Sequence, residues 1–381
     1  MTSRAGGDCP LRVAMIGQKG YPPVHGGIER HVAELAARLP GLGVEVDIYS
    51  RPHYSDADGP TTLEGVRVRR RPSLPTKHLD AISHTVMCTV DALSQRYDVV
   101  HYHALGPGLL AGAPRWLGRS ATVTTVHGLD WQREKWGAFA TWVLRFGELA
   151  SARLPDATIV VSRSLSDHYR DRYGRRTVCI PNGINPPLVL APEIIKGMGI
   201  RPGYVLFVGR LVPEKGCHLL IRAYAALPAD VRARHQLVVA GDAGFTEGYV
   251  KGLKAEAPAE TVFTGYVHGA TLAELWSNTT LVVLPSTLEG LSIALLEAMS
   301  YRNCCLVSDI PPNREAGGDT VEYVPAGETD ALTDAMATLL AAPERRESFA
   351  EQAAVRALAE YSWDTAAEAT ARVYREITSS L

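Results

Sequence analysis

Short apolar runs rich in β-branched residues alternate along this chain with longer segments of helical period, and the series occurs twice. In the first half the runs fall at 12–17, 44–49, 99–102, 122–126, 158–161 and 177–180. In the second half they fall at 204–208, 236–240, 261–263, 281–284, 304–307 and 321–324. Strands that alternate with helices are typical of parallel βαβ units. The fold class is therefore expected to be α/β, with two doubly wound, Rossmann-like domains.

A proline-rich stretch at 181–203 separates the two series and predicts an interdomain linker. The length of 381 residues also favours two domains, at roughly 150 residues each. We expect an N-terminal domain at 1–187, a C-terminal domain at 188–361 and a final helix at 362–381, with the option that it crosses back to the first domain. Other helices are expected at 28–39, 329–341 and 344–361. Such domains in tandem place a cleft between the carboxyl ends of their sheets, where these folds bind ligands.

The composition is that of an ordinary globular protein, with 46% hydrophobic and 21% charged residues. No apolar run approaches the roughly 20 residues of a membrane helix, and the polar segment 1–9 does not resemble a secretory signal. The six cysteines lack zinc-site spacing and are expected mostly in the core, in a reducing compartment. We therefore expect a cytoplasmic protein, either free or at the inner face of the membrane.

The net charge of −2 conceals an uneven distribution. Residues 1–187 carry 23 Lys and Arg against 17 Asp and Glu, a net +6, and the remainder carries 16 against 24, a net −8. The positive charge is diffuse and forms no stripe interleaved with aromatics, which excludes nucleic acid as the expected partner. The basic run RVRRR at 67–71 is predicted to be a solvated strand end.

The strongest motif is a pair of glutamates, Glu289 and Glu297, across a strand-to-helix junction. Eight residues make about 2.2 helical turns, so both carboxylates are expected on one side of a helix, Glu289 at its start. Backbone N–H groups of the residues between them would form a pyrophosphate site at the helix N-terminus: Gly290, Leu291, Ser292 and Ile293. The alternative is an ordinary helix start with acidic residues in its first turn.

A second motif, GRLVPEKG at 209–216, places Arg210 and Lys215 between a strand and a helix, where two cations could neutralise a diphosphate. A third is the glycine-rich turn at 17–29, in which Gly26 and Gly27 would let a ligand approach the backbone. The alternative is that these are solvated loop residues. The turn is not GxGxxG, and no strand is followed by that pattern, which disfavours a NAD-linked oxidoreductase.

Histidines lie at the ends of two strands that are expected in the first half of the chain. His127 and Asp130 lie in TVHGLDW, where an imidazole at a strand end could bind a substrate hydroxyl or titrate near neutral pH. His101 and His103 lie in VHYHA and could line the acceptor side. The alternative is that these histidines are satisfied by hydrogen bonds within the fold.

Together these motifs resemble the retaining nucleotide-sugar glycosyltransferases of the GT-B fold, the family (family 4) that contains sucrose, glycogen and mannosyl-type synthases. The resemblance runs from residue 12 to about residue 377 and is strongest at 127–136, 180–184 and 289–310, where it favours bacterial polysaccharide or antibiotic glycosyltransferases. It implies transfer of a hexosyl or N-acetylhexosaminyl group, with a UDP-sugar favoured, to a hydroxyl of a glycan, a lipid-linked or a natural-product acceptor.

The resemblance also implies residue roles. Glu289 would bind sugar hydroxyls near the anomeric carbon, Glu297 the ribose, and Arg210 and Lys215 the diphosphate. His127 would lie beside the transferred sugar. The other donor-site residues implied are Gly26, Gly27, Tyr266, Val267 and 290–293, and the acceptor-side residues are His101, His103 and Asp130.

No cofactor or metal is expected, because cationic side chains occupy the place of a metal, and the pair Asp56 and Asp58 is interpreted as a solvated loop. Two other functions stay open. One is a nucleotide-sugar epimerase of the same fold, and the other is a non-catalytic nucleotide-binding module. Aromatic residues at helical spacing in 131–153 are expected to form core or an acceptor groove, with an interfacial membrane helix as the alternative.

Overall fold

The computed structural model describes residues 10–23, 26–54, 62–63, 66–74, 76, 79–118, 120–133, 137–242 and 247–380. Cys9, the pair Asp56 and Asp58, Lys135 and Trp136 lie outside these ranges. The chain divides into two compact units. The first contains residues 1–182 together with 363–381, and the second contains residues 183–362.

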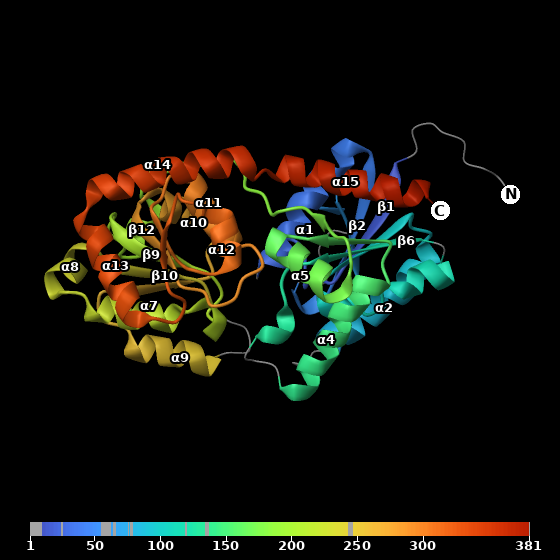
Figure 1. The fold of residues 1–381 in the computed structure, drawn as a ribbon, viewed down its shortest axis with the longest axis horizontal. Coiled ribbons are helices and arrows are strands. Elements are labelled where there is room, and N and C mark those ends of the chain that lie inside the picture. The colour runs from blue at the N-terminus through green and yellow to red at the C-terminus, as the bar shows by residue number, and fades with distance from the viewer. Residues whose placement is uncertain are drawn as a thin grey trace. The chain divides into compact units, whose positions relative to one another are not determined.

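The described part of the first unit contains one eight-stranded sheet in the order β3-β4-β2-β1-β5-β6-β7-β8, parallel except for the β3–β4 pair. Its strands are β1 (Leu11–Ile16), β2 (Val44–Ser50), β3 (Thr62–Leu63), β4 (Val66–Arg70), β5 (Val99–His103), β6 (Ala121–Val126), β7 (Ala157–Val160) and β8 (Val178–Cys179). Its helices are α1 (Gly27–Arg38), α2 (Asp80–Gln95), α3 (Leu105–Gly108), α4 (Ala138–Arg153), α5 (Arg163–Tyr173) and α15 (Trp363–Ser379) (Figure 1).

The RVRRR run forms the end of the paired strand β4 and the residue after it, as predicted, but only Arg67 is exposed, and the other arginines are half-buried. Strand β4 pairs with β2 on one side and β3 on the other, and Val66 and Val68 are buried. The arginines that alternate with these valines are held by carboxylates, since Arg69 Nε lies 2.6 Å from Asp47 Oδ2. Ion pairing of the polar positions allows this basic run to form a strand within the sheet.

The C-terminal helix α15 packs on the first unit, although the chain reaches it from the second (Figure 1). Trp363 and Tyr374, on its buried face, are 1% and 0% exposed. The phenol of Tyr374 hydrogen-bonds Nδ1 of His101 in β5 at 2.6 Å, and Asp364 pairs with Arg38 at the end of α1. Aromatic burial and these polar contacts therefore join the two ends of the sequence in one unit.

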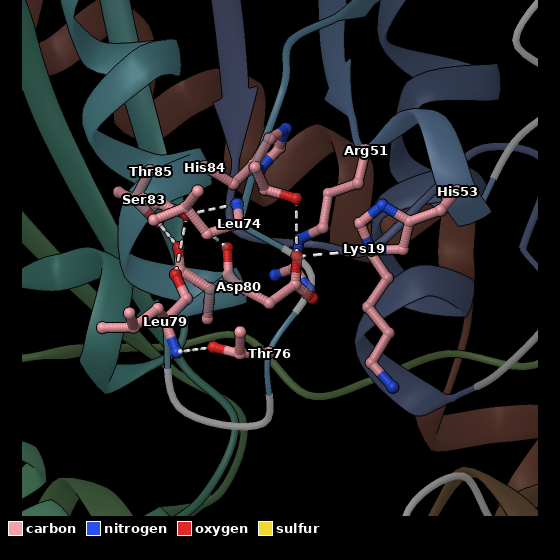
Figure 2. Close-up of polar contacts among 12 residues, drawn as sticks. Lys19, Arg51, His53, Leu74, Thr76, Leu79, Asp80, Ser83, His84 and Thr85 are labelled. Atoms are coloured by element: carbon pink, nitrogen blue, oxygen red, sulfur yellow. Dashed lines mark hydrogen bonds and ion pairs between the residues drawn. The ribbon is translucent and has the colours of Figure 1, made fainter.

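A buried polar cluster fixes the segment after β2 to the start of α2 (Figure 2). Arg51, 4% exposed, pairs with Asp80 at 2.6 Å, and His53 Nε2 lies 3.3 Å from the other Asp80 oxygen. Ser73 also donates to that carboxylate. No sequence motif marks this cluster, because its members come from separate segments.

The described part of the second unit contains a six-stranded parallel sheet in the order β11-β10-β9-β12-β13-β14. Its strands are β9 (Tyr204–Val208), β10 (Leu237–Ala240), β11 (Thr261–Gly265), β12 (Thr279–Leu284), β13 (Cys305–Ser308) and β14 (Glu322–Val324). Its helices are α6 (Ile194–Gly197), α7 (Cys217–Ala226), α8 (Ala229–Arg234), α9 (Glu247–Glu256), α10 (Gly269–Ser277), α11 (Ile293–Ser300), α12 (Pro311–Gly317), α13 (Thr329–Ala341) and α14 (Pro343–Glu360). The expected doubly wound class is confirmed in both units.

The proline-rich stretch is not a free linker. The second unit begins at Gly183, and residues after it pack on that unit. The buried carboxylate of Glu274 accepts hydrogen bonds from the backbone N–H groups of Ile194 and Ile195, at 2.8 and 3.0 Å. Asn278 donates to the carbonyl of Leu190 at 3.0 Å. Backbone hydrogen bonds of this irregular segment are thus satisfied by side chains of the second unit.

Of the described cysteines, Cys179 is exposed and the other four are buried, so the core prediction was right for all but one. No helix within the described ranges combines the length and the apolar character that crossing a membrane requires.

Candidate functional site

The two sheets each reverse their strand order at one point. In the second unit β9 and β12 are neighbours, and the chain builds outward from them in opposite directions. In the first unit the same holds for β1 and β5. The carboxyl ends of strands at such a switch point are where open α/β sheets bind ligands. In the second unit the GRLVPEKG segment follows β9, and the segment with Glu289 follows β12.

Gly216 brings these two segments into contact. Its φ is +69°, in the left-handed region, and a Cβ at this position would lie 2.1 Å from the carbonyl oxygen of Pro285. Thr287 adds a second connection, since its N–H donates to the Glu214 carbonyl at 2.9 Å. Only glycine satisfies both the conformation and the close approach. The start of α7 therefore packs directly against the residue that follows β12.

Lys215 and Glu289 form an ion pair across this junction. Lys215 Nζ donates to Glu289 Oε1 at 2.6 Å, and the side chains are 19% and 8% exposed. Two residues that are 74 positions apart in the sequence are thereby paired at the switch point. The other oxygen, Glu289 Oε2, accepts no hydrogen bond from the described residues, so it is available to a ligand hydroxyl.

The helix after Glu289 begins later than the spacing argument assumed. α11 runs from Ile293 to Ser300, and Ser292 caps it, because its Oγ accepts from the N–H of Leu295 at 3.3 Å. Glu289 therefore lies in the loop before the helix, and the expectation that it lies at the helix start, 2.2 turns from Glu297, was wrong. The residues between Glu289 and the cap include Gly290 and Leu291, both buried.

The remaining predicted donor residues of the second unit lie at the same edge of the sheet. Arg210 follows β9 by two residues, and Tyr266 and Val267 follow β11. These side chains and that of Glu297 are half-buried. The Tyr266 ring stacks on His268, with 6.4 Å between centroids. Every predicted donor residue of this unit therefore lies in a segment that follows β9, β11 or β12 in the chain.

In the first unit the glycine-rich turn joins β1 to α1. A Cβ on Gly17 would lie 2.3 Å from the carbonyl oxygen of His103, so the turn passes directly over the end of β5. Gly26 precedes α1 with an extended φ of 173°, and Gly27, the first helical residue, is exposed. Glu29 secures the turn by accepting from the N–H of Lys19 at 3.1 Å.

His101 does not have the geometry of an acceptor-binding residue. It is fully buried, Nδ1 bonds to Tyr374 at 2.6 Å, and Nε2 bonds to Thr125 Oγ1 at 2.7 Å. Burial lowers its pKa to about 3, so the ring is neutral. Because α15 supplies one of its partners, His101 connects the sheet to the C-terminal helix rather than to a ligand.

His103 and His127 lie together at the switch-point edge. His103 is fully buried, and its Nδ1 lies 3.3 Å from Nε2 of His127, which is half-buried. Burial first, and then the neighbouring histidines and Arg133, holds the pKa of His127 well below its usual value. The expectation that His127 titrates near neutral pH was therefore wrong, whereas its position at the end of β6 is as predicted.

Asp130 follows His127 in a loop that side chains hold firmly. Asp130 pairs with Arg133 at 2.8 Å. Trp131 Nε1 donates to the fully buried carboxylate of Glu148 in α4 at 2.7 Å. The HGLDW segment is thus anchored to α4 through Trp131.

Sequence reasoning missed His31 and Asn182. His31 lies one helical turn after Gly27, is 2% exposed, and its Nδ1 lies 2.9 Å from Asn182 Oδ1. The ring of His31 meets the ring of His127 edge-on, with 4.6 Å between centroids. A helical offset of four residues from the glycine pair is the signal that could have identified His31.

Comparison with known proteins agrees with this arrangement. Residues 25–187 match the family described as Glycosyltransferase Family 4, and residues 194–356 match Glycosyl transferases group 1. The chain is 28% identical to alpha-maltose-1-phosphate synthase of Mycolicibacterium smegmatis, over 97% of this chain and 100% of that protein. It is 31% identical to alpha-D-kanosaminyltransferase of Streptomyces kanamyceticus, over 77% of this chain and 71% of that protein.

An Anabaena protein solved in complex with UDP and glucose has the same fold, with a TM-score of 0.79 and 19% identity over 96% of this chain and 100% of that chain. The epimerase and the non-catalytic module are not favoured by these matches. Two matched domains, two doubly wound units and the paired motifs of the second unit lead to one conclusion: the chain belongs to the GT-B nucleotide-sugar glycosyltransferases, with group 1 and family 4 domains.

Proposed function

We propose that the protein is a retaining, metal-independent glycosyltransferase that moves a hexosyl or N-acetylhexosaminyl group from a UDP-sugar to an acceptor hydroxyl. The observation that carries the proposal is the Lys215–Glu289 pair at the switch point of the second unit. A cation that binds phosphate lies there beside a carboxylate with one oxygen available to a hydroxyl. A nucleotide sugar presents both groups close together, because its diphosphate is esterified to the anomeric carbon and the sugar hydroxyls are on the neighbouring ring carbons.

The spacing along the sheet supports the orientation of the donor. The end of β11, with Tyr266 and Val267, lies two strands from β9. Adjacent strands are about 4.8 Å apart, so the two loops are separated by about 10 Å. That span suits a nucleoside with its base over β11 and its diphosphate beside Arg210 and Lys215. Glu297 would then hold the ribose. The UDP of the Anabaena complex supports uridine as the base.

The proposed reaction breaks the bond between the anomeric carbon and the diphosphate oxygen and forms a bond from the acceptor oxygen to the same face of that carbon. The acceptor proton passes to the departing diphosphate. Negative charge grows on the leaving group, and preorganised cations stabilise such charge most in a partly buried site. Arg210 and Lys215 supply those cations, so no metal is required at the diphosphate. Glu289 orients the sugar through its available oxygen.

Substitution tests these roles. Lys215→Ala and Arg210→Ala are each expected to lower kcat/KM about 100-fold or more, as loss of one charge-stabilising donor does. Glu289→Ala should lower kcat as well as donor affinity, because its contact tightens at the transition state. Lys251→Ala, an exposed lysine of the same unit, is the matched control and should retain full turnover. Full turnover in Lys215→Ala would refute the phosphate assignment.

A donor panel identifies the nucleotide and the sugar. Purified protein is heated with UDP-, dTDP-, ADP- and GDP-hexoses, and the cognate donor should stabilise it by about 2.7 kcal/mol at a concentration of 100 Kd. The anomeric configuration of the product, read by NMR, tests retention. Turnover should persist in EDTA. Isomerisation of the donor sugar without acceptor would instead support the epimerase.

We further propose a lipid-linked acceptor at an anionic membrane surface. Three aromatic side chains of α4, Phe139, Trp142 and Phe146, are 77%, 57% and 49% exposed, and their rings are in contact along the helix. This helix face was expected to form core or to line an acceptor groove, and the exposure of Phe139 and Phe146 does not fit core. Exposed aromatics beside arginines such as Arg145 are typical of helices that lie in a membrane interface.

Vesicle flotation tests the membrane proposal. The protein should float with vesicles containing phosphatidylglycerol and less with pure phosphatidylcholine. Replacing Phe139 and Trp142 together by serine should abolish flotation, whereas Val355→Ser, an equally exposed apolar residue of α14, should not. If wild-type protein fails to float with anionic vesicles, or floats as well after the double substitution, the acceptor is to be sought among soluble glycans and natural products.

A further inference from the structure

Helix α2 presents an apolar strip to solvent in the first unit (Figure 1). The strip has five members, which recur at intervals of three or four positions: Leu79, Ile82, Val86, Val90 and Leu93. Leu79 directly precedes α2 and has a helical conformation, so all five lie within about 80° of arc on one side of the helix. Leu79, Val86 and Val90 are 49%, 42% and 60% exposed. An apolar side of a helix ordinarily packs against another element, so this exposure requires an explanation.

Two large apolar residues extend the strip. Trp116 and Leu117 are 70% and 75% exposed. They belong to the segment 114–118, which packs beside α2, since a Cβ on Gly118 would lie 2.8 Å from Cδ2 of Leu93. We call the five strip residues together with Trp116 and Leu117 the α2 patch. Its exposed area is on the order of the roughly 800 Å² that each partner contributes to a standard protein interface.

The α2 patch contains no charged residue. Helix α2 has no Lys or Arg, and its two aspartates are held by arginines of other segments, Asp80 by Arg51 and Asp91 by Arg71. Helices that bind anionic membranes carry cations beside their apolar side, as α4 does with the exposed Arg145. The cores of protein interfaces are instead depleted of charge and enriched in aromatic residues. The composition of the patch therefore favours a protein partner over a lipid surface.

The apolar strip has the same spacing in both directions along the helix. Val86 is its centre, and the other members lie four and seven positions before and after it. In a twofold contact both copies use the same surface, so residue i faces residue j and residue j faces residue i. Antiparallel packing of two α2 helices about an axis at Val86 places Val86 against its own counterpart. The same packing pairs Ile82 with Val90 and Leu79 with Leu93, so every member of the strip meets an apolar residue.

We propose that the α2 patch is the twofold interface of a homodimer, in which the α2 helices of two copies pack antiparallel with Val86 at the axis. Trp116 and Leu117 lie beside the strip and enlarge the contact. The proposal goes beyond the proposed transferase function. It does not depend on the donor or the acceptor, because no residue assigned to either belongs to the patch.

Sedimentation velocity of the full chain across a dilution series tests the oligomeric state. Wild-type protein should form a reversible dimer. Val86→Lys places two lysines against each other at the axis, and because such like-charge contacts are strongly unfavourable, self-association should weaken at least about 100-fold. Val355→Lys adds the same charge at an exposed valine of α14 in the second unit and should dimerise as wild type does. Thermal unfolding checks that both variants are folded.

Cysteine cross-linking tests the register of the two helices. In a background with Cys9 and Cys179 replaced by serine, Val86→Cys alone should form an intermolecular disulfide on mild oxidation. Leu79→Cys and Leu93→Cys should cross-link poorly alone and well when the two variants are mixed, since a disulfide requires Cα atoms within about 7 Å. Equal cross-linking by each of the three variants alone would refute a twofold axis at Val86.

Three further results would overturn the proposal. One is wild-type protein that stays monomeric at every concentration, and another is a dimer that Val86→Lys does not dissociate. The third is a monomer that binds phosphatidylglycerol vesicles and loses this binding in Val86→Lys, because the patch would then belong to a lipid surface. None of these results bears on donor binding, which is measured separately on the same proteins.

Discussion

Replacing Gly216 by alanine tests whether the close contact between the two motif segments positions the donor site. At φ +69° an alanine costs about 1–2 kcal/mol from the left-handed conformation alone. Its Cβ would also lie 2.1 Å from the backbone oxygen of Pro285, so the two segments must separate by about 1 Å or more. Overpacking of this kind adds about 1–3 kcal/mol. Gly216→Ala is therefore expected to lower the free energy of unfolding by about 2–5 kcal/mol in total.

Gly327→Ala is the matched control. Gly327 belongs to the same unit and has φ +87°, but a Cβ there would meet no atom within 4 Å. It should therefore show the conformational cost without the clash. For a unit of this size 1 kcal/mol corresponds to about 2–4 °C in Tm, so Gly216→Ala should melt about 2–12 °C below the control.

The assay has two readouts. Thermal unfolding gives the stability difference between the two variants, and calorimetric titration with UDP or the cognate donor gives the affinity. Because Lys215 adjoins Gly216, separation of the segments should weaken the Lys215–Glu289 pairing and donor binding, whereas Gly327→Ala should bind as wild type does. Equal Tm values and equal affinities for the two alanine variants would show that the contact does not position the site.

Tyr374→Phe leaves a buried nitrogen of His101 without its partner, so it should lower the free energy of unfolding by about 1–3 kcal/mol while donor affinity stays unchanged. If this variant instead changes the KM for the acceptor and leaves Tm unchanged, His101 belongs to the acceptor site. Ser292→Ala removes the cap of α11 and should cost about 1 kcal/mol in the same unfolding measurement. His84 is buried with a pKa of about 4, below its unfolded value near 6.5, so the unfolded state binds more protons between these values. The free energy of unfolding should fall by about 3 kcal/mol as pH drops from 6.5 to 4, and it should fall less in His84→Gln. If wild type and His84→Gln lose stability identically over this pH range, the buried neutral state of His84 is refuted. The groups that face His84 are Arg51, Asp80, His53 and Cys88.

The sequence by itself determined the architecture and the edge of the second sheet at which Lys215 and Glu289 lie. Apolar runs at 204–208 and 281–284 became β9 and β12 because the period of a strand is a local property of the chain. Once both are strands of a doubly wound sheet, their carboxyl ends share an edge, and the loops with Lys215 and Glu289 must lie there. The closing helices α13 and α14 were found to within one residue for the same local reason.

Tertiary structure decided what depends on contacts between distant segments. Ion pairs to Asp47 hold Arg67 and Arg69 of β4, which a basic run does not reveal. A serine cap, rather than the spacing of two glutamates, set where α11 begins. His31, His103 and His127 are separated by whole βα units, and only the order of the strands and the packing of α1 bring one ring nitrogen of each within 4.8 Å of the others. Hydrophobic periodicity depends on neighbouring residues and can be recognised in the sequence. A site that combines several elements forms only when the folded sheet brings particular strands side by side.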